Sequence, residues 1–204
     1  MTSLMPWHAD LIPWYVFAAY WLITALRVKR AKAAEKLSDR VASLIVLIAG
    51  FALLLSDWPA GGWLRQRWLP IDSRIEWAGV AITTVGVAIA IWARYCIGEY
   101  WSAGVTLKEG HRLIRAGPYG FVRHPIYTGI LMGAVGSALT QGERREIVAV
   151  ALVLAAYWRK ALREESMLTQ EFGDEYAEYR KGTGFLLPRI WSRRVEQGEG
   201  RGEE

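Results

Sequence analysis

Apolar residues in this chain gather in five long runs, and the charged residues are concentrated in the connections between them and in a C-terminal tail. The runs lie at about 11–26, 41–57, 76–96, 126–140 and 147–162. The first three approach the roughly 20 residues that a helix needs to cross a bilayer. No run alternates with a period of two, and unpaired strands would leave backbone groups unsatisfied in lipid. The pattern therefore predicts an all-α, polytopic membrane protein with about five transmembrane helices.

The composition agrees with a lipid environment. Of the 204 residues, 52% are hydrophobic and 11 are tryptophan, an unusual load for a water-soluble domain of this size. The N-terminus lacks a basic segment and a small-residue cleavage site, so we expect the first apolar run to stay in the mature protein. The net charge of +5 lies beside the apolar runs without interleaved aromatics, so membrane lipids are the expected partners rather than nucleic acid.

The distribution of lysine and arginine predicts the orientation of the chain. The connections 27–40, 97–125 and 159–204 together hold nineteen of these residues, and the connections on the opposite side hold five. Positive loops are normally retained in the cytosol. We therefore expect an N-terminus outside, a C-terminus in the cytosol and, as the membrane, the inner membrane of a bacterium.

Three regions follow from this pattern. Residues 1–96 would form three transmembrane helices with their connecting loops, and residues 97–190 a catalytic region. That region would include a helical hairpin at about 126–162, with its turn at the polar segment 141–146. Residues 191–204 are too polar to pack a core and are predicted to be disordered.

The connection before the fourth run holds the first group of reactive side chains. Pro118 and Pro125 restrict the residues before them to non-helical conformations. Pro125 also suits the first turn of a helix, which would place His124 at the helix cap and Tyr127 inside the first turn. Such a terminus attracts anionic groups. Alternatively, Arg123 and His124 are ordinary boundary residues whose polar ends reach toward water.

A second group follows the fifth run and contains Glu164 and Glu165 among several cations. These carboxylates could pair with Arg159 or Lys160 at helical spacing, or could bind a cationic group of a ligand. An amphipathic helix at 171–180 follows and could cover a site. In the fourth run, glycines recur at spacings of four and three, which favours close packing against a neighbouring helix and leaves a groove for a lipid chain as the alternative; these are Gly129, Gly133 and Gly136.

The two groups, in this order and at this distance, resemble the isoprenylcysteine carboxyl methyltransferase and phospholipid methyltransferase family of integral membrane enzymes. The resemblance covers about residues 101–188. It depends on the ordered motifs His111-Arg112-Leu113-Ile114, Gly117-Pro118-Tyr119, Arg123-His124-Pro125-Ile126-Tyr127-Thr128-Gly129, Glu164-Glu165, Phe172-Gly173-Asp174-Glu175-Tyr176-Ala177-Glu178-Tyr179 and Leu187-Pro188.

The resemblance implies a cytosolic S-adenosylmethionine site in the C-terminal region. The implied cofactor contacts are His111, Arg112, Leu113, Ile114, Tyr119, His124, Pro125, Tyr127, Glu164 and Glu165. The implied catalytic residues are His124, Glu164 and Glu165; the substrate-binding residues are Arg123, Arg159, Lys160 and Arg163, and no metal ion is expected. In the eukaryotic carboxyl methyltransferases, the position aligned with Lys160 is an arginine, which grips a carboxylate at two points as an ammonium cannot.

The predicted activity is methyl transfer from S-adenosylmethionine to a lipophilic acceptor at the cytosolic membrane face. The acceptor would be a small molecule or a lipidated substrate with a carboxylate, thiol or amine, and its identity and the oligomeric state stay open. One rival is an NADPH-dependent membrane reductase of the sterol reductase type, although adjacent carboxylates suit an ammonium better than phosphates. The other is a non-catalytic membrane subunit.

Overall fold

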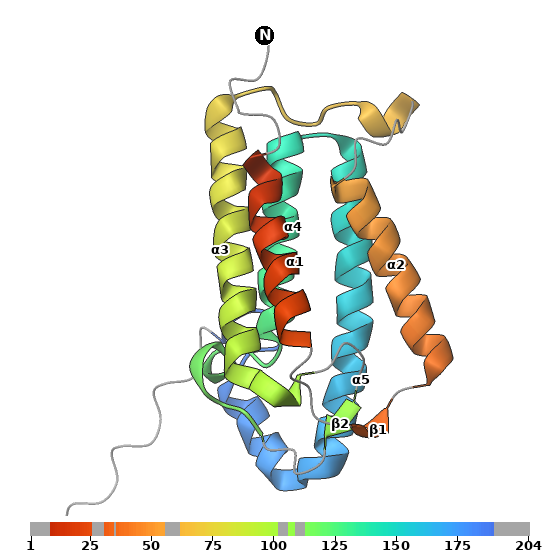
Figure 1. Cartoon of the computed structure of the whole chain (residues 1–204), viewed down its shortest axis with the longest axis vertical. Coiled ribbons are helices and arrows are strands. Elements are labelled where there is room, and N and C mark those ends of the chain that lie inside the picture. Colours follow the sequence, from red (N-terminus) through yellow and green to blue (C-terminus); the bar gives the residue numbers. More distant parts are fainter. Residues whose placement is uncertain are drawn as a thin grey trace, which may run out of the picture.

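The chain folds around five helices, as seen in a computed structural model that describes residues 9–25, 31–34, 36–55, 62–101, 106–108 and 113–189. Figure 1 shows α1, α3 and α4 side by side, with α5 and α2 forming a second group beside them. The helices are α1 (Ile12–Ala25), α2 (Leu37–Leu55), α3 (Ser73–Ile97), α4 (Pro125–Gln141) and α5 (Arg144–Gly182). The prediction of a helical core is confirmed.

Two short strands lie in the connections and were not predicted. Strand β1 (Ala31–Ala34) pairs antiparallel with β2 (Thr106–Lys108) at the lower end of the molecule in Figure 1. Segments of three and four residues are too short to show a period in the sequence. The pair joins the connection after α1 to the connection after α3, outside the helical core.

Two of the described helices are long and apolar enough to cross a membrane, Leu37–Leu55 and Ser73–Tyr100; Ile12–Thr24 is a shorter apolar helix. Only 11% of the α2 window and 33% of the α3 window is buried inside the protein, so their apolar faces point outward. On α2, the side chains of Leu44, Ile45 and Ile48 are each more than half exposed. Apolar belts of this kind fit a lipid surface rather than water.

The glycines of α4 pack directly against α3. A β-carbon on Gly129 would lie 2.5 Å from the carbonyl oxygen of Gly86, and one on Gly136 would lie 2.5 Å from the amide nitrogen of Thr83. Thr83 also donates a hydrogen bond to the carbonyl of Gly133 at 3.1 Å. Close packing is therefore confirmed, and the alternative of a lipid groove along these glycines is wrong because α3 occupies that side.

Helices α4 and α5 form the predicted hairpin with a short turn. Gly142 ends α4 in the left-handed conformation, with φ of 65° and ψ of 21°, and its amide donates to the carbonyl of Ala138 at 2.9 Å. This is a common helix ending in which glycine avoids the steric cost of a side chain. Helix α5 starts two residues later at Arg144.

Helix α5 is much longer than the predicted run at 147–162, and it changes direction once. Gly173 has φ of 50° and ψ of −122°, outside the helical range, so α5 consists of two helical parts. Residues with side chains rarely adopt this conformation. The predicted helix at 171–180 is thus largely the second part of α5, and the break turns it back toward the start of α4, as Figure 1 shows in blue.

The segment after α5 pairs with the segment before α4. Val122 and Gly184 form a parallel bridge. The amide of Arg123 donates to the carbonyl of Gly184 at 2.9 Å, and the amide of His124 to that of Phe185 at 3.3 Å. Two segments about 60 residues apart in the sequence thus lie together at the entry to α4.

Candidate functional site

His124 sits at the start of α4 in the predicted geometry. It is the N-cap residue with φ of −123° and ψ of 57°, and Pro125 occupies the first turn. Pro118 likewise lies in the first turn of a short 3₁₀ helix, Gly117–Gly120. The His124 side chain is 4% exposed, and its ring lies parallel to the ring of Tyr127, with 5.5 Å between the ring centroids. The cap therefore presents a buried imidazole whose orientation is set by a neighbouring ring.

Glu164 and Glu165 of α5 lie on opposite sides of the His124 ring. Nδ1 of His124 is 3.3 Å from Oε2 of Glu164, and Nε2 is 3.3 Å from Oε1 of Glu165. Burial lowers the pKa of His124, but the hydrogen bonds to Glu164 and Glu165 outweigh it, so its pKa is raised above its ordinary value. The sequence-predicted histidine and glutamates are thus brought together, and the arrangement favours an imidazolium.

Glu165 is held by several side chains from different parts of the chain. Its carboxylate lies 2.5 Å from Nε of Arg123 and 3.3 Å from Nε of Arg180, and it accepts a hydrogen bond of 3.0 Å from the hydroxyl of Tyr176. Burial raises its pKa, but the bonds from His124 and Arg123 prevail and lower the pKa to about 2. Glu165 is therefore ionised and fully engaged with groups of the protein.

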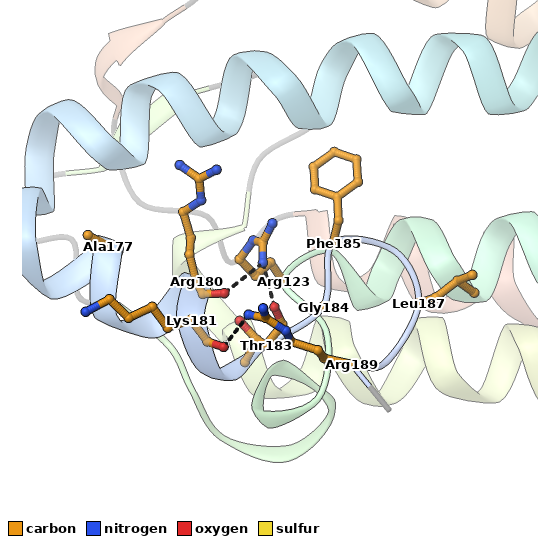
Figure 2. A pocket seen from close by; sticks show the side chains of 9 residues that line it. All are labelled: Arg123, Ala177, Arg180, Lys181, Thr183, Gly184, Phe185, Leu187 and Arg189. Atoms are coloured by element: carbon orange, nitrogen blue, oxygen red, sulfur yellow. Dashed lines mark hydrogen bonds between the residues drawn. The ribbon is translucent and has the colours of Figure 1, made fainter. Parts of the chain in front are cut away.

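Arg123 connects this carboxylate to the C-terminal segment. Its guanidinium donates from Nη1 to the carbonyl of Thr183 at 2.7 Å and to that of Arg180 at 3.5 Å (Figure 2). The planar guanidinium can satisfy a carboxylate and backbone carbonyls together because its donors point in fixed directions. Arg123 thus ties the start of α4 to the end of α5.

Glu164 is the more accessible of the two carboxylates, with a side chain 23% exposed against 10% for Glu165. It accepts a short hydrogen bond from the hydroxyl of Tyr127. Burial acts to raise its pKa, but His124 and the nearby charge of Lys160 lower the pKa below its ordinary value. The site therefore contains a second ionised carboxylate with part of its surface open.

Aromatic rings form the wall beside Glu164. The rings of Tyr127 and Tyr157 stack with centroids 4.6 Å apart, and Nζ of Lys160 lies 5.3 Å from the Tyr127 ring centroid. Tyr119 is buried nearby, and its carbonyl accepts a hydrogen bond of 2.7 Å from Tyr179. Cations are attracted to such ring faces.

The predicted substrate-binding cations separate into two pairs. Arg123 and Lys160 lie beside the glutamates, whereas Arg159 is exposed and Arg163 contacts α2, with Nη1 3.3 Å from Oγ of Ser43. A helix turns 100° per residue. Lys160, four residues before Glu164, therefore shares its face, while Arg163 points about a quarter turn away.

Of the four remaining predicted cofactor contacts, the structure describes two. Leu113 and Ile114 are half-buried, and Ile114 packs against the apolar core. His111 and Arg112 lie outside the described residues.

Several site residues were missed at the sequence level. Tyr176 and Arg180 are four residues apart on the helix that was expected only to cover a site, and both contact Glu165. Tyr157 lies seven residues before Glu164, two helical turns along the same face. The helical spacing of these residues can be recognised in the sequence. The turn at Gly173, which directs Tyr176 and Arg180 to Glu165, cannot.

Comparison with known proteins shows to which family the chain belongs. The family model described as phospholipid methyltransferase matches residues 75–175. A probable protein-S-isoprenylcysteine O-methyltransferase of Oryza sativa subsp. indica is 30% identical over 176 residues, which cover 84% of this chain and 88% of the relative.

Two further relatives are similar over shorter parts of their own length. The protein-S-isoprenylcysteine O-methyltransferase of Schizosaccharomyces pombe is 29% identical over 110 residues, covering 47% of each chain. Methanethiol S-methyltransferase 1 of Bradyrhizobium diazoefficiens is 28% identical over 170 residues, covering 75% of this chain and 55% of the relative. Because these relatives are named as methyltransferases, the comparisons favour a methyltransferase over the rival predictions of a reductase and of a non-catalytic subunit. The chain belongs to the isoprenylcysteine carboxyl methyltransferase and phospholipid methyltransferase family and is a membrane methyltransferase.

Proposed function

We propose that the chain transfers a methyl group from S-adenosylmethionine to a lipophilic, anionic acceptor at the cytosolic membrane face. The observation that supports this most directly is the ionised, partly open carboxylate of Glu164 beside the tyrosine wall of Tyr127 and Tyr157. S-adenosylmethionine supplies an electrophilic methyl group on a sulfonium cation. Its ammonium group requires an anionic partner, and its sulfonium suits a dry aromatic surface.

The described residues fit these requirements. Glu164 would hold the ammonium group, and Tyr127 and Tyr157 would face the adenine or the sulfonium. The positive end of α4 would attract the carboxylate of the cofactor. In this proposal His124 orients Glu164 through the 3.3 Å contact to its Oε2.

The two glutamates would have different roles. Glu165 already has Arg123, His124, Tyr176 and Arg180 as partners, so binding an ammonium group would disrupt existing contacts. We therefore assign Glu165 to positioning the start of α4 and the second part of α5. Glu164 is assigned to the cofactor because it has the larger open surface.

The position of Lys160 favours an anionic acceptor. Its ammonium lies above the Tyr127 ring and would attract a carboxylate or thiolate and repel a protonated amine. The named relatives methylate isoprenylcysteine at oxygen and methanethiol at sulfur. Such anions attack the methyl group without losing a proton, so alignment and exclusion of water would supply most of the catalysis.

The proposed topology places α1 to α4 and the first part of α5, up to about residue 162, in the membrane, with the N-terminus outside and the site on the cytosolic side. The acceptor would enter sideways from the bilayer. Because α3 covers the glycine face of α4, the entry would lie elsewhere around the site. Helix α1, with 14 residues, and α4, with 17, would need a locally thinner apolar layer.

Cofactor binding tests the role of Glu164. We expect Glu164→Gln to weaken S-adenosylmethionine binding by roughly tenfold to a hundredfold, because a charged hydrogen bond is lost. The measurement is calorimetric titration of the purified protein in detergent, with melting temperature as the check on folding. The exposed surface variant Glu175→Gln should bind like the wild type.

Unchanged binding in Glu164→Gln would contradict the site assignment, and binding of a nicotinamide dinucleotide in place of S-adenosylmethionine would contradict the cofactor. Incubation with labelled cofactor and a lipid extract would then identify the methylated product. Transfer only to a water-soluble thiol would overturn the lateral entry of the acceptor.

A further inference from the structure

A basic pocket beside the proposed methyl-transfer site lies between the second part of α5 and the loop that follows it. Its volume is about 550 Å³, and Figure 2 shows the side chains around it. The residues that matter for its chemistry are Arg123, Arg180, Lys181, Arg189, Phe185 and Leu187. Arg123 and Arg180 also contact Glu165 and so are shared with the site described above.

The pocket carries an excess of positive charge. Four of its lining residues are cations and none is a carboxylate. Glu165 pairs with Arg123 and Arg180, and Glu178 pairs with Lys181 at 2.8 Å in a contact where both side chains are about 70% exposed. Glu165 and Glu178 thus compensate three of the four cations, and the charge of Asp174 also acts on Lys181. Among the described residues Arg189 has no carboxylate partner, which leaves an excess of positive charge in the pocket.

Backbone contacts hold two of these cations in place. Arg189 donates from Nη1 to the carbonyl of Lys181 at 2.5 Å, and Arg123 donates to the carbonyl of Thr183 at 2.7 Å. The carbonyl acceptor leaves the charge of Arg189 uncompensated, whereas Glu165 compensates the charge of Arg123. Cations fixed before binding lose less entropy when an anion arrives.

The loop beside the cations is apolar and runs along the start of α4. The hydroxyl of Thr128 in the first turn of α4 donates to the carbonyl of Leu186 at 2.6 Å. The next residue, Leu187, is 77% exposed. The loop therefore places an exposed leucine where the apolar run of α4 begins, and Figure 2 shows Leu187 on the side of the pocket away from Lys181.

We propose that this pocket binds the phosphate of an anionic phospholipid, with the lipid chain along Leu187. The lipid would be a bound partner and not the methyl acceptor. Cationic side chains near a membrane surface attract anionic headgroups. A free phosphate offers the same charge, but it would leave Leu187 exposed to water, so the arrangement favours the lipid. This inference does not depend on the identity of the cofactor or the acceptor.

Native mass spectrometry of the full chain in detergent tests the proposal. The probes are phosphatidylglycerol, phosphatidylcholine with the same acyl chains, and inorganic phosphate. We expect the wild type to retain phosphatidylglycerol roughly tenfold more strongly than phosphatidylcholine, since the preference comes from several cations each contributing to headgroup attraction. Lys181→Gln combined with Arg189→Gln should abolish this preference and leave S-adenosylmethionine affinity unchanged.

A matched control removes the same charge elsewhere on the same end of the molecule. Lys36 and Arg40 are exposed at the start of α2, and the double glutamine variant should keep the preference. Arg189→Lys, which retains the charge, should also keep the preference for phosphatidylglycerol. This variant distinguishes a loss of charge from a loss of folding in the double variant. Equal retention of the two lipids by the wild type, or equal loss in the two double variants, would overturn the proposal. Displacement of phosphatidylglycerol by inorganic phosphate would overturn the lipid as the source of the anion.

Discussion

The two ends of the helical bundle each contain buried charges, but the charges meet in different ways. At the α4–α5 turn, Nε of Arg145 lies 2.8 Å from Glu143 and 3.0 Å from Glu146, all within four consecutive positions. At the opposite end, Glu165 meets Arg123 and His124 from about 40 residues earlier. The first cluster can form when a single helix starts. The second cluster forms only when distant segments of the folded chain come together. We call such a cluster a composite site.

The largest expected effect comes from breaking the long-range cluster. Glu165→Gln should lower the free energy of unfolding by about 3 kcal/mol, because removing one partner leaves buried cations uncompensated. Cofactor affinity should fall with it, since Arg123 and His124 would lose their positions. Chemical unfolding in detergent and cofactor titration are the two measurements.

Glu146→Gln is the matched change at the other end of the bundle. It should also destabilise the protein, because Glu146 is fully buried, but cofactor affinity should stay at the wild-type value. If both variants lost affinity equally, the distinction between a local cluster and a composite site would fail.

The pH dependence of stability should show a smaller effect with two limbs. The pKa of Glu165 is lowered from 4.5 to about 2, so its contribution is fully present above 4.5 and is lost as the pH falls through 2. The pKa of His124 is raised from 6.5, so its contribution is fully present below 6.5 and is lost as the pH rises through the raised value. Stability should be greatest between about pH 4.5 and 6.5.

Melting temperatures measured from well below pH 4.5 to well above pH 6.5 would follow both limbs. His124→Gln should flatten the alkaline limb. An alkaline limb that persists in His124→Gln would assign the titration to a different group.

The smallest effect is expected from a charge pair at the surface. Arg115 lies 3.1 Å from Glu175, and their side chains are 45% and 58% exposed. Arg115→Ala should cost about 0.5 kcal/mol or less, since water and salt screen exposed pairs. A loss of unfolding free energy as large as that of Glu165→Gln would contradict the expectation that buried ion pairs contribute more to stability than exposed ones. Thermal unfolding is sufficient to measure it.

The sequence predicted the parts of the fold that depend on local chemistry. Hydropathy located the five helices, and Pro125 correctly placed His124 at a cap and Tyr127 in the first turn. The glycines of α4 predicted a close helix contact, which α3 provides. The meeting of the histidine with the two glutamates was expected from the charge pattern together with the family resemblance.

The parts that depend on the direction of the chain could not be predicted in this way. A glycine within a helical pattern does not specify whether the chain bends, and Gly173 turns it enough to bring Arg180 to Glu165. The pairing of Gly184 with Val122 involves backbone groups that leave no pattern in the side chains. Arg94, near the end of α3, is 2% exposed and donates to the carbonyls of Thr24 and Gly98, contacts that depend on where the chain passes.

The backbone pairing at residues 122 and 184 also bears on how the protein is made. The carbonyls of Gly184 and Phe185 accept the amides of Arg123 and His124, so the entry to α4 is completed by residues translated after both helices of the hairpin. A nascent chain that ends at Gly182, the last residue of α5, still lacks these acceptors. During biosynthesis, the entry to α4 can therefore be completed only after the segment beyond α5 has been translated.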